Sequence, residues 1–175
     1  QRRLLQKHLV RWLASAQPME PYEYTFRGGF LEDLGQVRAA RFLAHAAAVF
    51  AEHPVRRVTL VDVKPEHLDA LVALGCLEQL THLSVRGNLG DAAVARLVEA
   101  PWVAQLESLN VGGNKVGPNG AIVLAQSPNL THLRSLALHS NKLEDAGAGA
   151  FAGDATLGRC QSLYLTANKV SDEGV

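Results

Sequence analysis

The chain has 175 residues, and its 17 basic and 17 acidic side chains give a formal net charge of zero at pH 7. Hydrophobic residues make up 47% and charged residues 19% of the chain, which is typical of a globular protein and argues against intrinsic disorder. The balanced charge argues against a nucleic-acid binder, and no apolar run approaches the roughly 20 residues of a membrane span.

The first predicted element is an amphipathic helix over residues 1–16. Lys7, His8 and Arg11 interrupt its apolar stretch, which argues against a signal peptide. Two interpretations are open: a helix that binds a membrane surface or a partner, and a helix that covers the end of a packed domain. The second is favoured, because a stacked architecture needs caps at its ends.

A turn, an aromatic cluster and a second helix are expected next. The turn is predicted at Gly28-Gly29, and helical spacing of apolar residues runs over 36–53 until Pro54 ends it. The cluster is either a ligand pocket or, as we favour, a small local core; its members are Tyr22, Tyr24, Phe26 and Phe30. We therefore expect residues 1–54 to be an α-helical N-terminal cap.

Residues 55–175 carry a repeated frame, L-x-x-L-x-x-L-x-L-x-x-N. Four copies end on asparagines 26, 27 and 27 residues apart, and a degenerate first copy has Val63 at that position. Such a period is the signature of a solenoid and lies in the leucine-rich-repeat range. The frame predicts one degenerate repeat, three full repeats and a fourth that is incomplete at the C-terminus.

Each copy of the frame predicts one short strand. The L-x-L alternation points the leucines into the solenoid, and stacked copies would form a parallel sheet. The asparagine follows the strand, where its amide can satisfy buried backbone groups. We therefore predict a buried structural ladder that touches no ligand, formed by Asn88, Asn114, Asn141 and Asn168.

A helix is expected after each strand. One should run from Pro65 to about Leu74, and others should begin at Pro118, Asp145 and Asp172, where proline or aspartate suits a first helical turn. This alternation resembles the ribonuclease-inhibitor-like class of leucine-rich repeats. The resemblance implies a right-handed α/β solenoid with its parallel sheet on the concave face and its helices on the convex face.

A second resemblance concerns the region before the repeats. The order GGFLEDL, helix, HPVRRVTL is similar to the segment that precedes the repeats in a family of bacterial leucine-rich-repeat proteins. This implies that residues 1–54 are a companion cap, and it assigns them no activity. The excess of arginine over lysine, 12 to 5, also points weakly to a GC-rich bacterial genome.

The chain contains two cysteines, Cys76 and Cys160. Cys160 replaces a repeat leucine and should be buried as a small apolar residue. The two lie three repeats apart, too far for a disulfide, so two free thiols in a reducing compartment are expected. We predict a cytoplasmic protein on this basis.

The sequence offers little that suggests catalysis. Gly112-Gly113-Asn114-Lys115 lacks the ending of a phosphate-binding loop and is explained by the repeat frame. The histidines have no zinc-ligand spacing, and no G-x-S-x-G elbow is present. We therefore predict no catalytic residues, no metal and no cofactor, and we do not expect an enzyme.

The residues between the strand leucines are left for recognition. They should line the concave face, with Arg86, His139 and Tyr164 as the larger side chains and Tyr and Arg as usual anchors of interfaces. A merely solvated face is the alternative. The predicted protein-binding residues are His82, Ser84, Arg86, Asn110, Arg134, Ala137, His139, Tyr164 and Thr166.

Three functions remain open on the sequence. The favoured one is a non-catalytic protein-interaction module that binds a protein of unknown identity through the concave face. The alternatives are the recognition part of a larger enzyme or effector, and a scaffold for self-assembly. The last repeat stops at Val175 where its helix should begin, so we expect either further chain or another molecule to cover that end.

Overall fold

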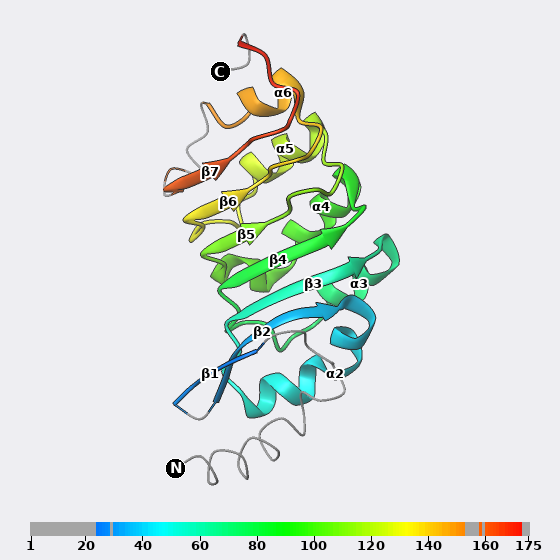
Figure 1. Ribbon diagram of the computed structural model, residues 1–175, viewed down its shortest axis with the longest axis vertical. Coiled ribbons are helices and arrows are strands. Elements are labelled where there is room, and N and C mark those ends of the chain that lie inside the picture. The colour runs from blue at the N-terminus through cyan, green and yellow to red at the C-terminus, as the bar shows by residue number, and fades with distance from the viewer. Residues whose placement is uncertain (1–23, 29, 153–157, 159, 173–175) are drawn as a thin grey trace.

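The structure is a computed structural model that describes residues 24–28, 30–152, 158 and 160–172. The helix expected at 1–16, together with Tyr22 and Gly29, lies outside these residues. Seven strands form one sheet in chain order, β1 to β7 (Figure 1). Their bounds are β1 Thr25–Arg27, β2 Phe30–Arg38, β3 Arg57–Val63, β4 His82–Gly87, β5 Ser108–Asn110, β6 Ser135–Ala137 and β7 Ser162–Tyr164.

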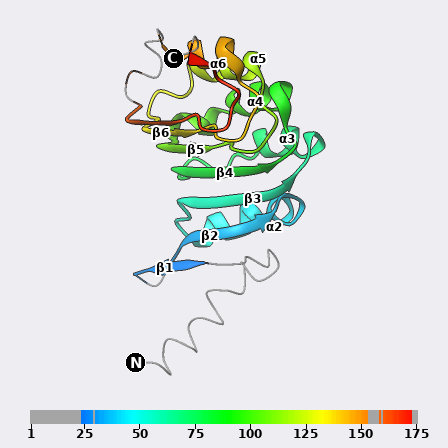
Figure 2. The same cartoon turned by 45° about the horizontal axis from the view of Figure 1, so that its top comes forward.

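The sheet is mostly parallel. β1 pairs antiparallel with β2, whereas each pair from β2–β3 to β6–β7 is parallel. Strand then helix then neighbouring parallel strand is the α/β solenoid arrangement that the repeat frame predicted. Figure 2 shows the helices of the repeats gathered along one side of this sheet, so the other side is left open.

The helices begin close to the predicted positions. Proline occupies the first turn of two of them, where its missing N–H costs no hydrogen bond. The helices predicted to start at Pro65 and Pro118 are confirmed. The helices are α2 Ala39–Glu52, α3 Pro65–Val72, α4 Gly90–Val98, α5 Pro118–Ala125 and α6 Glu144–Gly149, with a 3₁₀ helix at Pro101–Gln105.

The region before the repeats contains strands as well as a helix, unlike the all-helical cap that the sequence suggested. The expected helix over 36–53 begins at Ala39, because the residues before it belong to β2. The three-residue spacing of buried Leu31, Leu34 and Val37 looks helical, but a bulge at Gly35, whose φ is +59°, produces it within a strand.

The β1–β2 hairpin turns at Gly28, as predicted, with φ +59°. The local aromatic core expected here is wrong for Tyr24 and Phe30, which are 42% and 52% exposed. Phe26 packs partly against the main core, and Tyr24 meets it edge to face with ring centroids 5.8 Å apart. Tyr24 and Phe30 therefore lie on the surface of the hairpin. Together with Phe26 they do not form a separate core.

One continuous hydrophobic core runs from Leu31 of β2 to Leu143 beside α6. The strand leucines Leu83, Leu109 and Leu136 are at most 2% exposed and stack in register from β4 to β6. Because this core crosses residue 54 without a break, β2 and α2 are packed as part of the same solenoid body.

Three of the four predicted ladder asparagines form the ladder. Asn141 is 6% exposed, and its Oδ1 accepts hydrogen bonds from the backbone N–H groups of Asn114 at 2.9 Å and Val116 at 3.0 Å. Its Nδ2 donates to the carbonyls of Val111 and Leu138 at 3.0 and 2.8 Å. Each amide therefore ties its own turn to the preceding turn. The other members of this ladder are Asn114 and Asn168.

The prediction is wrong for Asn88, which is exposed. In the repeat before it, Val63 takes the asparagine position and is buried. β3 and β4 also stay paired as far as Val63 and Gly87, so strand pairing takes the place of the contacts that a buried Asn88 would make to the turn after β3. Strands β3 and β4 are accordingly longer than β5 to β7, where asparagine side chains in place of strand pairing bond the backbone after each strand.

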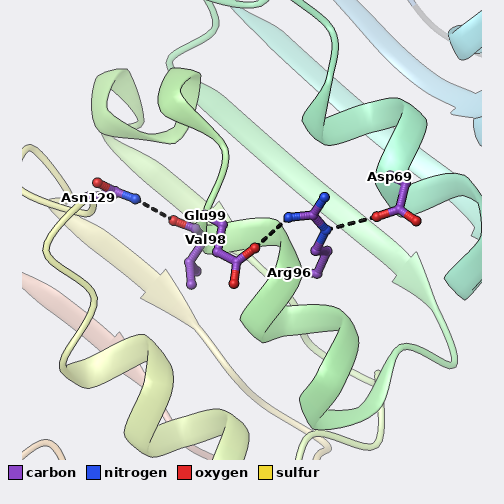
Figure 3. A network of polar contacts seen from close by, with 5 residues as sticks. All are labelled: Asp69, Arg96, Val98, Glu99 and Asn129. Atoms are coloured by element: carbon purple, nitrogen blue, oxygen red, sulfur yellow. Dashed lines mark hydrogen bonds and ion pairs between the residues drawn. The ribbon is translucent and has the colours of Figure 1, made fainter.

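The helical side carries polar contacts between neighbouring turns (Figure 3). Arg96 of α4 donates through Nε to Asp69 of α3 at 2.8 Å and pairs through its guanidinium with Glu99. Asn129 donates through Nδ2 to the carbonyl of Val98 at 2.8 Å. The ion pairs are exposed, so they contribute little to stability compared with the ladder.

Aspartates near the starts of two helices accept hydrogen bonds from the following repeat. Asp145 lies in the first turn of α6, as expected, but it makes no capping hydrogen bond there. Its carboxylate instead accepts from the backbone N–H of Ser171 at 2.7 Å and from the Ser171 hydroxyl at 2.8 Å. Both hydrogen bonds lower the pKa of Asp145, and the one from the backbone N–H has the larger effect. Asp91 accepts in the same way from the backbone N–H of Gly117, one repeat later.

The two cysteines are free thiols in the structure. Cys160 was expected to be buried, but it is half-buried at the entrance to β7, with Sγ 3.3 Å from the carbonyl oxygen of Ser162. Burial raises the pKa of Cys76, which disfavours its reactive thiolate form.

Candidate functional site

The side of the sheet that faces away from α3 to α6 is the face expected to be concave, and we call it the open face (Figure 2). Strand pairing aligns its residues in columns that run across the strands. The first column is Asp33, Arg57, His82, Ser108, Ser135 and Ser162. The second column is Gln36, Thr59, Ser84, Asn110, Ala137 and Tyr164.

A third column lies at the residues that follow the second. It begins with Arg38 opposite Val61 and continues, by the repeat frame, through Arg86, Gly112, His139 and Thr166. Between β4 and β7 the first two columns lie where the frame predicts, whereas the third column and the use of these residues in binding stay predictions. Arg134 differs, because it precedes β6 by one residue and lies at the edge where the strand begins.

The sequence analysis missed the contribution of β2. Asp33, Gln36 and Arg38 extend the columns by one strand, because β2 pairs with β3 in the same parallel sense as the repeats. The bulge at Gly35 disrupts the period-two alternation that marks a strand, so the sequence carried no clear signal for them.

A shallow depression of about 240 Å³ lies on the open face over β3 to β5. Arg57 and His82 line it on one side, and Ser108 and Asn110 on the other. The Oγ atom of Ser84 is buried there and has no hydrogen-bond partner among the described residues. An unpaired buried hydroxyl is unfavourable for the folded protein, and this atom is shielded from the depression by the surrounding side chains.

His82 is the titratable group in this depression whose ionisation is most affected. Burial lowers its pKa, and the nearby Arg57 guanidinium lowers it further, against the smaller opposing effects of Glu107 and Asp33. A neutral imidazole at pH 7 offers one donor and one acceptor. Its Nδ1 lies 2.9 Å from the Thr81 hydroxyl, and no described hydrogen bond joins it to a serine or a carboxylate. A neutral imidazole with one free ring nitrogen can donate a hydrogen bond to a bound partner or accept one from it.

The three larger side chains proposed as anchors belong to different repeats: Arg86 and Tyr164 lie in β4 and β7, and His139 follows β6. Arg86 is exposed at the end of β4, and Tyr164 of β7 is 53% exposed. The ring of His139 lies against the backbone of Gly112, where a Cβ atom would come within 2.4 Å of it. Glycine at this position therefore lets the imidazole lie flat on the neighbouring turn.

A larger hollow, of about 560 Å³, lies where β3 and β4 end. Its polar side chains are those of Asp62, Lys64, Arg86 and Asn88, beside the backbone of Gly87. This is the place where the asparagine ladder stops. In the later repeats the asparagine at this position is buried in the interior. Here the equivalent residue, Asn88, is exposed and points outward.

The repeat pattern was compared with known protein families. Residues 105–125 and 129–152 match the family described as Leucine Rich repeat. These two segments are leucine-rich repeats. They cover the strand, ladder and helix of the turns built on β5 and β6, and the neighbouring turns share their strand register. No curated protein matches the chain.

Leucine-rich repeats generally serve as interaction modules that carry no catalytic activity of their own. Within the described residues, no group of three His, Cys, Asp or Glu side chains could hold a metal ion. None of the helices in that same part of the chain is long and apolar enough to cross a bilayer.

Proposed function

We propose that the chain is a protein-interaction module that binds a partner protein through the open face. Leucine-rich repeats commonly mediate protein–protein interaction, which supports the proposal. The observation that carries it is the register of side chains across β2 to β7. The core does not need these side chains, and some of them line a shallow depression on the open face.

The finer features of the module belong to the same proposal. We infer a right-handed solenoid of the ribonuclease-inhibitor-like type, with residues 1–54 as its cap and residues 55–175 as its repeats. We also infer a bacterial, cytoplasmic protein that is not an enzyme, and the free thiols of Cys76 and Cys160 support the reducing compartment. A role as the recognition part of a larger enzyme or effector is compatible with this, and the full reading frame would test it.

The open-face proposal is tested by removing its large side chains together. The variant Arg86→Ala/His139→Ala/Tyr164→Ala should lose at least about tenfold in partner capture, because truncating such anchors typically costs more than about 1 kcal/mol each. The measurement is quantitative affinity capture from the native lysate, read by mass spectrometry, with circular dichroism to confirm the fold.

The matched control replaces the same residue types away from the open face. Arg41→Ala/His45→Ala/Tyr24→Ala changes helix α2 and the hairpin, so it should retain the proteins that the unmodified chain captures. Equal capture by the unmodified chain and both triple variants would show that the open face does not carry binding.

Self-association is a second candidate, and it rests on β7. Leu163 continues the column of strand leucines, yet it is 40% exposed where Leu136 is fully buried. Tyr164 beside it is also exposed. A second molecule that paired with β7 would cover both side chains. Light scattering over a concentration series should then show a mass increase that Leu163→Lys removes, and a constant monomer mass would exclude this role.

A further inference from the structure

The lysines of the described residues share one position in the repeat. Each follows the ladder position directly, after Val63 in the degenerate repeat and after an asparagine in the later ones. Arginine, in contrast, is spread over strands, helices and loops of the described chain. The residues of this lysine row are Lys64, Lys115, Lys142 and Lys169.

The ladder forces these side chains outward. Because each asparagine is buried, the chain must turn sharply after it, and Lys115 and Lys169 adopt φ values of +61° and +57°. All four lysines are exposed. The backbone N–H of Lys142 bonds to the carbonyl of Val116 at 2.8 Å, so adjacent turns stay in contact here. Successive lysines of neighbouring turns are thus spaced by about the 4.8 Å strand separation.

The row lies beyond the carboxyl ends of the strands, since Lys64 directly follows β3 and the other three lysines come shortly after β5, β6 and β7. Its one gap is at the second repeat, where the equivalent residue is the buried Leu89. Beside that gap lies the 560 Å³ hollow with Lys64, Arg86 and Asn88 in its lining. Positive charge therefore continues across the gap through the Arg86 side chain.

Most of this charge has no partner within the protein. Among the described residues, Lys115, Lys142 and Lys169 make no ion pair, whereas Lys64 lies 3.5 Å from Glu66. Asp62, which also lines the hollow, is paired with Arg38 at 3.5 Å. Like charges on neighbouring strands repel each other, so this row is unfavourable by itself and becomes favourable against a row of negative charge.

We propose that the lysine row binds an extended acidic segment of a partner protein, with one of its carboxylates entering the hollow beside Arg86 and Asn88. Carboxylates on one side of an extended chain repeat about every 6.6 Å, and the flexible four-carbon stems of the lysines can span the difference from about 4.8 Å, so several pairs can form at once. The four lysines lie outside the strand columns of the open face, whereas Arg86 belongs to the third column as well as to the hollow, so the row is tested through its lysines alone.

The chemistry of the row favours a protein over a nucleic acid. Binding of single strands relies on aromatic side chains that stack on bases, and no aromatic residue interleaves with these lysines in the described repeats. The chain has no net positive charge to attract a polyphosphate, and the exposed Glu144 flanks the row near Lys142.

The test uses a fluorescein-labelled decaglutamate peptide and measures its binding by fluorescence anisotropy at low salt. Lys115→Gln/Lys142→Gln/Lys169→Gln should weaken binding about tenfold and flatten its salt dependence, since each exposed pair contributes modestly. Arg27→Gln/Arg41→Gln/Arg56→Gln removes the same charge elsewhere and should bind within about twofold of the unmodified chain. Both triple variants and the unmodified chain are compared by circular dichroism.

The probes separate the competing explanations. A neutral Gly-Ser peptide of equal length should not bind, and a single-stranded DNA oligonucleotide should bind more weakly than decaglutamate. Tighter binding of the DNA, equal losses in both triple variants, or no binding of decaglutamate would each overturn the inference. The lysine variant keeps Arg86, His139 and Tyr164, so its effect is distinguishable from failure of the open-face proposal.

Discussion

Replacement of Asn141 by alanine should lower the free energy of unfolding by about 2–6 kcal/mol, since two buried N–H groups lose their acceptor at a cost of about 1–3 kcal/mol each. These are the backbone N–H groups of Asn114 and Val116, both bonded to Asn141 Oδ1. The carbonyls of Val111 and Leu138 lose a donor as well. Urea denaturation at equilibrium, followed by circular dichroism, measures the change.

Asn88 provides a control of the same residue type at the same repeat position. Because it is exposed and outside the ladder, Asn88→Ala should change stability by less than about 0.5 kcal/mol. Similar losses in the two variants would mean that burial in the ladder is not what gives Asn141 its effect.

The contrast between these asparagines shows how far the sequence predicts this fold. The frame identifies strands, core leucines and helices because it encodes their periodicity directly. The fate of Asn88 depends on the preceding turn, where Val63 replaces asparagine and keeps β3 and β4 paired. Whether an asparagine is buried in the ladder depends on the turn that packs beside it, so it cannot be predicted from its own repeat alone.

The candidate site divides in the same way. Columns on β4 to β7 follow from alternation within each repeat, so His82, Ser84 and Tyr164 could be placed without a structure. Asp33 could not, because the bulge in β2 hides the strand. The lysine row did have a signal in the sequence, the recurring Asn-Lys pair, which becomes meaningful once the turns are known to stack.

Gly87→Ala should destabilise the protein by about 3 kcal/mol, at the upper end of overpacking effects, because the obstacle is backbone. A Cβ atom at this position would lie 2.0 Å from the carbonyl oxygen of Val63 and 2.9 Å from its carbonyl carbon. To relieve this contact β4 must separate from β3 where Val63 and Gly87 pair, and the Gly87 N–H would move from Asn114 Oδ1, now at 2.9 Å.

Gly75→Ala is the matched substitution, because nothing lies within 4 Å of a Cβ atom there. It should change the free energy of unfolding by less than about 1 kcal/mol, with a slight gain expected from the reduced entropy of the unfolded chain. Urea denaturation again measures both variants. The close approach of the two strands is what requires glycine at position 87, so a Gly87→Ala protein as stable as Gly75→Ala would show that β3 and β4 are not packed this tightly. A large loss of stability in Gly87→Ala alone would support close packing of β3 against β4, the pair of strands where the ladder ends.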